Sequence, residues 1–568
     1  MPAPVSKEWV IGPSDAAACA ALSGALGVHR LTAAVLVARG HRSVLEARAA
    51  LDGADAPGPD PFLLAGMEQA VDRLHLARRR REQVLVYGDY DVDGACATSL
   101  YLGFLKSLGL AASFYIPHRV KEGYGLHADA VRRIAASGTT LLITADCGTT
   151  SHDEIALARS LGLDVIVTDH HLPGDTLPPA LVVLNPCRRD SGYPFSGLCS
   201  GGLAYKVASA YCQKFETTEF DPEAHLDLVA LSTIADVAPL QHENRRLVRR
   251  GLGLLSRGNR PGIRALKAVA GVEGGCGVGT VGFALAPRIN AAGRLGDAAD
   301  AVRLLLTEDE REAGQLAGLL NRLNQERQRL EEGIIAEAAQ AAEATPSGPI
   351  VLASRGWHLG VVGIVAARLV ERFHRPAVLI ALDERGVGRG SARSIPGVSV
   401  YDALLQCRQH LDTFGGHAAA AGLTIREARI PEFRDRLSEV LEGPLAGPAA
   451  RPRLLCDVEV EPGGFLPSVV QELARLGPFG SGNPEPTVVL RRLRVASARV
   501  VGADHLKLVL TGRGVQHEAI GFRMGSLESR GLSPAGPVDI ACVLETNTWN
   551  GTERVQLRLR DVRASVNG

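Results

Sequence analysis

Acidic residues and histidines cluster in four short segments, and three of these segments directly follow a run of apolar residues. The segments read GDYDVDG, TADCG, TDHH and TIAD, in that order along the chain. They contain Asp89, Asp91, Asp93, Asp146, Asp169, His170, His171 and Asp236. Carboxylates a few ångströms apart cannot all stay ionised in a partly dry cleft unless cations neutralise them. If the fold brings the segments together, they form a site for metal ions.

The ligand types indicate which metals this site would take. Oxygen ligands combined with one or two imidazoles suit Mn²⁺ or Mg²⁺ better than zinc or a thiolate-binding metal. Two such ions about 3.5–4 Å apart support in-line attack of water on a phosphate ester. The predicted chemistry is therefore metal-dependent hydrolysis of a phosphoester.

The elements that must position these residues are predicted to be parallel strands. Short apolar runs at 84–88, 113–117, 141–145, 165–169 and 181–185 alternate with helix-length segments. This alternation is typical of a parallel, doubly wound sheet, and continuous apolar runs indicate strands buried on both faces. In such sheets the active site lies at the carboxyl ends of the strands, which is where three of the acidic segments fall.

The first acidic segment has an alternative interpretation. Asp89, Asp91 and Asp93 match the start of an EF-hand calcium loop, but the position that needs a bidentate Glu is Leu100. A predicted strand, not a helix, precedes the segment. Both observations argue against an EF-hand.

Other residues also have a plainer interpretation when taken singly. Asp146 alone fits a helix N-cap, and His170 alone fits a structural histidine. Gly277, Gly279 and Gly282 spell GxGxxG, but no clear strand leads into them, so we expect loop glycines rather than a dinucleotide site. The co-occurrence of several acidic strand ends favours function for Asp146 and His170.

The rest of the chain predicts further domains, so the expected fold class is α/β multidomain. The predicted parts are an N-terminal helical segment at 1–60, a parallel doubly wound catalytic domain at 61–306, a connecting helix at 307–346, a second α/β domain at 347–448 and an OB-like β-barrel at 449–568. Breaks rich in Gly and Pro at 53–60 and 443–452 indicate boundaries. The barrel prediction depends on about five short strand-like runs and a hairpin turn at Asn550-Gly551.

The connecting helix is predicted from its start signal and its apolar stripe. Thr307 and Glu310 form a capping-box pattern, and TPSGP at 345–349 ends the helix. The stripe consists of Leu316, Leu320, Leu323, Leu330 and Ile334. A helix of this length would span about 55 Å and is expected to join two domains.

Composition excludes several protein classes. The 568 residues include 46% hydrophobic and 22% charged residues, which argues against disorder. The 62 basic and 62 acidic residues give a net charge of +0, so any anion-binding site must be local. The 10 cysteines show no CxxC pair, and no apolar run suits a signal peptide or a membrane span. A cytoplasmic protein with no membrane contact is expected.

The acidic segments and several other short motifs of the chain resemble those of a known protein family. The four acidic segments, in this order, resemble the DHH phosphoesterase superfamily, whose name describes Asp169-His170-His171. Further segments at 185–206, 286–298, 356–369, 390–394, 414–424 and 477–486 are similar to the RecJ family of single-strand-specific 5′→3′ exonucleases. The resemblance covers about residues 60–560. It implies that the second α/β domain is a DHH-associated domain, which closes over substrate.

The resemblance also implies metal ligands. One ion would be held by Asp91 and Asp146. The other would be held by Asp93, Asp146, His170 and Asp236, with Asp146 bridging the pair. Asp89 and His171 would have a supporting catalytic role, orienting ligands or the attacking water.

Substrate-binding residues are expected outside the acidic segments. Arg119 and Tyr124 would grip a phosphate and stack a base. The other candidates are Arg288, Asn290, Arg294, His358, Ser391, Arg393, Gly415, Gly416 and His417. A pocket for the terminal 5′-phosphate made by Arg119, Ser391 and Arg393 would explain cleavage from that end. The alternatives are a loop charge for Arg119, a domain-interface role for Arg294 and a packing role for His358.

The predicted function is hydrolysis of single-stranded DNA from its 5′ end to nucleoside 5′-monophosphates, in DNA repair and recombination. The family resemblance implies single-strand-binding protein and a RecQ-type helicase as partners, and association with the nucleoid. One alternative is a DHH phosphoesterase for short oligonucleotides or small nucleotides, but an OB-like segment favours a long polymer. Another is an inactive replication scaffold, but the intact acidic residues argue against it.

Overall fold

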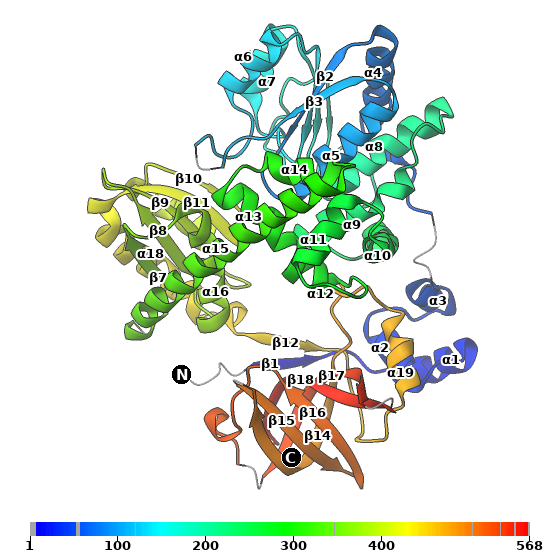
Figure 1. The fold of residues 1–568 in the computed structure, drawn as a ribbon. Coiled ribbons are helices and arrows are strands. Elements are labelled where there is room, and N and C mark those ends of the chain that lie inside the picture. The colour runs from blue at the N-terminus through cyan, green and yellow to red at the C-terminus, as the bar shows by residue number, and fades with distance from the viewer. Residues whose placement is uncertain are drawn as a thin grey trace. The chain divides into compact units, whose positions relative to one another are not determined.

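A computed structural model describes residues 7–52, 57–119, 121–345, 347–502, 504–533, 536–549 and 552–565. The chain divides into two units. Figure 1 colours the ribbon by residue number from the N-terminus to the C-terminus. One unit comprises Pro57–Ala450 with Gly480–Gly482, and the other comprises Met1–Ala56, Arg451–Phe479 and Asn483–Gly568. The domain boundaries expected at residues 60, 306, 346 and 448 stay predictions.

A parallel sheet carries the acidic segments. Its strand order is β3-β2-β4-β5-β6, and every neighbouring pair is parallel. The strands are β2 (Gln83–Gly88), β3 (Ala111–Tyr115), β4 (Leu141–Ala145), β5 (Asp164–Thr168) and β6 (Val182–Leu184). After β2 the chain forms β3 at one edge of the sheet. It then returns to the other side of β2, where β4, β5 and β6 follow in order. The carboxyl ends of β2 and β4 therefore flank the crevice where open α/β sheets bind ligands.

Helices cover both faces of this sheet, which confirms the doubly wound prediction (Figure 1). On one face lie α4 (Met67–Arg80), α5 (Val92–Ser107), α8 (Ser200–Phe215) and α9 (Leu226–Ala235). On the other face lie α6 (Ala128–Ala136) and α7 (His152–Ser160). The first core is extended by α10 (His242–Arg257), α11 (Pro261–Val269), α13 (Ala286–Leu295) and α14 (Ala299–Leu306). Because both faces are covered, the strands read as continuous apolar runs.

The long helix α15 (Glu310–Ala344) belongs to two hydrophobic cores. Its first half places Leu320 in the core of the parallel sheet, and its second half places Ile334 in a core shared with α16 (Leu359–Phe373). The predicted capping box at Thr307 is wrong. Thr307 is the C-cap of α14, and Asp309 caps α15 by accepting from the backbone N–H groups of its first turn. Thr307 therefore ends α14 and is not available to cap α15.

The second α/β region is a mixed sheet in the order β10-β11-β9-β8-β7. Its strands are β7 (Ile350–Ser354), β8 (Ala377–Leu382), β9 (Val387–Arg393), β10 (Thr413–Gly416) and β11 (Ala420–Arg426). Helices α15 and α16 pack on one face, and α17 (Val400–Gln406) and α18 (Ile430–Ala446) pack on the other. The expected break at 443–452 begins inside α18, which continues through Pro444.

The C-terminal barrel is confirmed. Its order β14-β15-β16-β18-β17 closes because β17 also pairs with β14. The strands are β14 (Val488–Val501), β15 (His505–Gly512), β16 (Val515–Gly521), β17 (Pro537–Trp549) and β18 (Thr552–Ala564), with β13 (Val458–Glu459) beside β14. A helix, α19 (Pro467–Ala474), packs into the same core. The predicted turn Asn550-Gly551 lies outside the described residues.

The N-terminal segment packs with this barrel and is not wholly helical. Strand β1 (Glu8–Ile11) pairs in parallel with β12 (Arg453–Cys456), a partner that local sequence does not indicate. Three helices follow, α1 (Ala16–Leu26), α2 (Arg30–Ala38) and α3 (Val44–Asp52). Part of the expected linker, residues 53–56, lies outside the described residues.

The expectation of loop glycines at the GxGxxG motif is corrected by the structure. Gly279 lies in α12 (Val278–Thr280) and Gly282 in a π-helix (Val281–Leu285) that continues directly into α13. Val281 and Leu285 are buried in the main core, which fixes this helical path. Among the described residues, no helix is long and apolar enough to cross a membrane.

Candidate active site

The first acidic segment forms the turn from β2 into α5. Asp91 is the N-cap of α5, and its Oδ1 accepts from the backbone N–H groups of Asp93 at 2.9 Å and Gly94 at 3.1 Å. Gly94 is required because a Cβ there would meet the backbone of Asp89. The strand before and the helix directly after this turn exclude an EF-hand.

Asp93 is held at the N-terminus of α8. Its Oδ2 accepts from the N–H of Ser200 at 2.8 Å, and its Oδ1 accepts from the N–H of Gly201 at 2.9 Å and from the hydroxyl of Ser232. The positive end of the α8 dipole favours this buried carboxylate. Sequence reasoning missed these donors, although the segment SGG at 200–202 opens an apolar helix.

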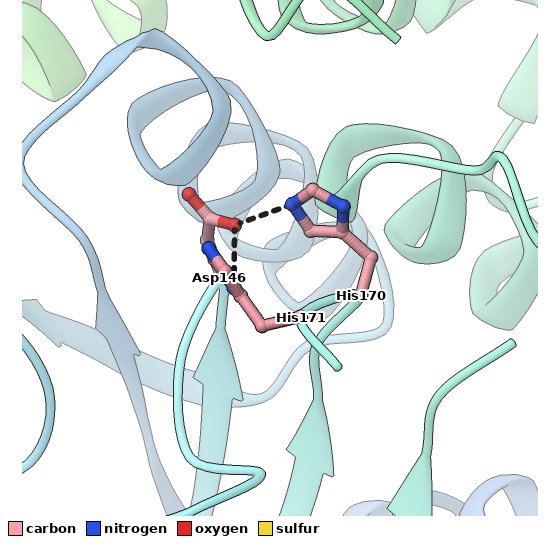
Figure 2. A group of neighbouring side chains, drawn as sticks. All are labelled: Asp146, His170 and His171. Atoms are coloured by element: carbon pink, nitrogen blue, oxygen red, sulfur yellow. Dashed lines mark hydrogen bonds and ion pairs between the residues drawn. The ribbon is translucent and has the colours of Figure 1, made fainter. Parts of the chain in front are cut away.

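Asp146 follows β4 and connects the acidic segments. Its Oδ1 lies 3.1 Å from His170 Nε2, and it accepts from the Ser200 hydroxyl at 3.0 Å. Figure 2 shows Asp146 together with His170 and His171 near the ends of the parallel strands. Asp146 adopts φ +72°, a left-handed conformation that is uncommon for a residue with a side chain. Strained backbone of this kind often occurs at functional sites.

Asp169 organises the segment that presents the two histidines. It accepts from the N–H of Thr149 at 3.0 Å and from His170 N–H at 2.8 Å, and His171 Nδ1 lies 2.7 Å from it. Burial opposes ionisation of Asp169, but hydrogen bonds from His171 and Thr149 lower its pKa below the ordinary value. Burial likewise disfavours the charged His171, but Asp169 raises its pKa to about 9.

Asp236 completes the cluster from the C-cap of α9. Its Oδ2 lies 3.8 Å from His170 Nε2, and His170 Nε2 lies 3.5 Å from Asp93 Oδ2. Burial, followed by the charges of Asp93 and Asp91, raises the pKa of Asp236 to about 8. His170 therefore contacts carboxylates from three separate segments.

The cluster fits divalent cations. Three groups have ligand atoms that all lie within 4.8 Å of one another. They are Asp146 with His170 and His171; Asp93 with His170 and Asp236; and Asp89 with Asp91 and Asp146. Burial and neighbouring carboxylates raise the pKa of Asp89 and of Asp146. Asp89 Oδ1 is buried without a hydrogen-bond partner in the described part of the chain. Cations would stabilise the ionised form of all these groups.

Three arginines lie near this cluster. Arg119 lies 4.7 Å from the centre of the Tyr90 ring, Arg294 Nη1 donates to Gly360 O at 2.9 Å, and Arg393 Nη1 donates to the adjacent Ala392 O. Burial and the charge of Arg119 lower the pKa of Arg294 to about 9 and also lower that of Arg393. Within the described ranges, none of the three forms an ion pair with a carboxylate. This arrangement favours a bound anion.

Two glycines allow the helices that carry these groups to approach closely. A Cβ at Gly293 in α13 would collide with the carbonyl oxygen of Tyr90, within the first acidic segment. A Cβ at Gly363 in α16 would lie 3.1 Å from Ser391 Oγ and 3.2 Å from Arg393 Nη2. Ser391 and Arg393 share one face of β9, because side chains two positions apart point the same way.

Other predicted substrate residues have defined positions. The Tyr124 hydroxyl donates to Asp146 O at 3.1 Å and lies 3.1 Å from His171 Nδ1, while the Tyr124 residue is 46% exposed. His358 is the N-cap of α16, and its Nδ1 accepts from Gly360 N–H. Asn290 precedes Arg294 by one turn of α13 and shares its face.

Arg288, Gly415, Gly416 and His417 make no hydrogen bond or ion pair with the acidic cluster in the described part of the chain. Arg288 donates to Asn321 Oδ1 at 3.0 Å and to Ala284 O at 2.6 Å, which ties it to α15 and to its own helix. Gly415, Gly416 and His417 are exposed at the β10–β11 hairpin. Gly415 lies opposite Gly422, which lies opposite Ser391, so these positions share one face of the sheet.

Comparison with known protein families shows to which family this chain belongs. Models described as "DHH family, N-terminal domain", "DHHA1 domain" and "RecJ OB domain" match residues 83–233, 347–443 and 456–561. The single-stranded-DNA-specific exonuclease RecJ of Escherichia coli (strain K12) is 37% identical over 529 residues, covering 88% of this chain and 90% of that protein. This chain belongs to the RecJ family. The RecJ of Bacillus subtilis (strain 168) is 39% identical over 568 residues, covering 98% of this chain and 71% of its own length.

Solved RecJ structures have the same fold. RecJ from Thermus thermophilus in complex with Mn²⁺ is 33% identical, with a TM-score of 0.85 over 99% of this chain and 80% of that one. The Mg²⁺ complex of the same protein gives a TM-score of 0.78 at 32% identity, over 99% and 79% of the two chains. The predicted RecJ membership and fold class are confirmed.

Proposed function

We propose that this protein is a single-stranded-DNA-specific exonuclease that hydrolyses phosphodiester bonds with bound Mn²⁺ or Mg²⁺. The observation that carries this proposal is the cluster of acidic groups beside Arg119, Arg294 and Arg393. Buried carboxylates require cations, and half-buried guanidinium groups without carboxylate partners in the described part of the chain favour a bound anion. A phosphodiester bound by metal ions meets both requirements. Relatives named as single-stranded-DNA-specific exonucleases, and RecJ structures in complex with Mn²⁺ or Mg²⁺, support the same conclusion.

The proposed ligands are Asp91 and Asp146 for one ion, and Asp93, Asp146, His170 and Asp236 for the other. When bound, the ions would activate water and offset charge that develops on the phosphate. Ser200 and Ser232 hold Asp93 in place, and Asp169 holds His171. Asp89 and His171 support the ligands by orienting them or the attacking water.

Cleavage from the 5′ end follows if the terminal phosphate occupies a pocket made by Arg119, Ser391 and Arg393. Gly363 keeps α16 close to Ser391 and Arg393, and the charge of Arg119 acts on Arg393. A phosphate fixed there places the next phosphodiester at the metals. The product is a nucleoside 5′-monophosphate, and the shortened strand again carries a 5′-phosphate.

Single-strand specificity is proposed to arise from contacts that a duplex cannot make. The exposed ring of Tyr124 would stack on an unpaired base, and the exposed segment Gly415–His417 would approach the backbone. Asn290, Arg294 and His358 would line the path of the strand. By family resemblance, we extend the proposal to a role in DNA repair and recombination. The proposed partners are single-strand-binding protein and a RecQ-type helicase, and the proposed location is the nucleoid in the cytoplasm.

The experiment uses a 5′-labelled single strand, a 3′-labelled single strand and the corresponding duplex, each with Mn²⁺, Mg²⁺ or EDTA. We expect labelled mononucleotide from the 5′-labelled single strand at the earliest times, and no product in EDTA or with Asp93→Ala. Early release of mononucleotide from the 3′ label, or activity in EDTA, would overturn the proposal. Faster hydrolysis of dinucleotides than of long strands would favour the short-oligonucleotide alternative.

A further inference from the structure

Phe283 is an aromatic side chain that the fold leaves almost uncovered. It is 89% exposed, although it lies in a helical segment between buried Val281 and Leu285. The segment is a π-helix, a form that often occurs at functional sites. The proposed catalytic and phosphate-binding groups do not include this residue. An aromatic ring in this position is available to contact a ligand.

Phe283 shares a helix face with residues of the proposed substrate path. The helix is continuous from Val278 to Leu295. Pro287, Asn290 and Arg294 follow one another at helical spacing in its α-helical part, and Phe283 lies about one turn before them in the π-helix. None of these positions is buried, whereas Val281, Leu285 and Ile289 face the core. Asn290 therefore lies on the same side of the helix as Phe283, and this side leads toward Arg294, whose guanidinium donates to Gly360 O.

The same π-helix packs beside the end of α9, which carries Asp236. A Cβ at Gly282 would lie 4.0 Å from Ile234 Cγ2, and Asp236 caps the helix that contains Ile234. Val237, directly after Asp236, is 68% exposed and has φ +57°, an outlier for a β-branched residue. Two exposed apolar side chains thus lie on the segments that flank one candidate metal ligand.

We propose that Phe283 is a stacking site for a nucleobase of the single strand, displaced along the helix from the phosphate near Arg294. This inference rests on the proposed function. Arg294 follows Phe283 by eleven positions, which corresponds to about 16 Å along a helix. A single strand advances about 3.4 Å or more per stacked nucleotide, so this distance spans up to about five nucleotides. Aromatic stacking accepts any base, which suits an exonuclease that must degrade every sequence.

A nucleobase fits this face better than an apolar peptide does. The face combines one aromatic ring with the polar Asn290 and the cationic Arg294, and Arg294 makes no ion pair within the described residues. A hydrophobic partner would leave that charge without a counterion, whereas a nucleic acid strand supplies both a base for the ring and a phosphate for the arginine.

The test compares Phe283→Ala and Phe283→Trp with the unchanged protein on oligothymidylates of two to ten nucleotides, with Mn²⁺. Leu161→Ala is the matched control, because it removes another exposed apolar side chain from the same unit. We expect kcat/KM of the unchanged protein to rise at the length that reaches Phe283. Phe283→Ala should lose about 5- to 100-fold on the longer strands and nothing on the dinucleotide. Phe283→Trp and Leu161→Ala should keep the rise.

Two outcomes would overturn the inference. One is a Phe283→Ala profile identical to that of the unchanged protein at every length. The other is an equal loss on dinucleotide and decamer together with a lower Tm without DNA, which would indicate a structural role. Inactivity of the unchanged protein on every single strand would instead overturn the proposed function, so the two failures are distinguishable.

Discussion

The Ser200 hydroxyl donates to Asp146 Oδ1 at 3.0 Å, while the N–H of the same residue donates to Asp93 Oδ2 at 2.8 Å. Ser200 therefore links two proposed metal ligands that follow different strands, β2 and β4, and lie far apart in the sequence. Through this link, the N-terminus of α8 fixes the distance between the two carboxylates.

Replacing Ser200 with Ala should weaken Mn²⁺ binding about 10- to 100-fold, because removal of a group that orients a ligand typically has this effect. The backbone donor to Asp93 remains, so the fold should be retained. Calorimetric titration with Mn²⁺ measures the affinity. Ser209→Ala is the control, since that hydroxyl donates to Tyr205 O within the same helix. Equal affinities in the two variants would contradict the assigned role.

The stability of the metal-free protein should fall as pH rises from about 4 to about 8. Burial and neighbouring charges raise the pKa of Asp89 and Asp146, and that of Asp236 to about 8, so the folded state retains protons that the unfolded chain has lost. His171, with its pKa raised to about 9, acts in the same direction above about pH 6.5. Asp169 has a lowered pKa and acts oppositely, but only in acid.

Thermal unfolding in EDTA and in Mn²⁺ at pH 5, 6.5 and 8 measures this effect. We expect Tm in EDTA to decrease with pH, and the stabilisation by Mn²⁺ to be largest at pH 8, where protons compete least with the ion. A Tm in EDTA that increases steadily over this range would contradict the assigned carboxylate cluster.

Arg393→Ala should reduce the preference for a 5′-phosphate about 10- to 100-fold, the range expected for charge-assisted hydrogen bonds of about 1.5–3 kcal/mol. The comparison uses strands that end in 5′-phosphate or 5′-hydroxyl. Arg436→Ala, which removes an arginine paired with Glu439 on α18, is the control. An equal loss of activity on both ends would show that Arg393 does not read the terminal phosphate.

Gly293→Ala should destabilise the protein by about 1–3 kcal/mol, because the added methyl group would collide with Tyr90 O and displace α13. Gly333→Ala in α15 has open space around the new methyl group and should stabilise the helix by about 0.5–1 kcal/mol. Urea denaturation measures both variants. Similar values for the two substitutions would indicate that α13 does not pack closely on Tyr90.

The sequence by itself determined the catalytic sheet and the place of its acidic residues. Continuous apolar runs between helix-length segments require parallel strands buried on both faces, and parallel strands present their carboxyl ends at one edge. The sequence therefore predicted that Asp91 and Asp146 lie at the same edge, and the structure places the strands before them, β2 and β4, side by side. Boundary signals were less reliable, because Thr307 ends α14 and Asp309, not Thr307, caps α15.

Only the tertiary structure decided which hydrogen-bond donors and which arginines lie at that edge of the sheet. Ser200 reaches Asp93 because α8 packs against α5, and Arg294 and Arg393 are brought near Arg119 by close helix contacts at Gly293 and Gly363. Arg288, only six positions from Arg294, points instead to α15. Local sequence records residue type and periodicity, whereas these contacts depend on how helices distant in sequence pack against one another.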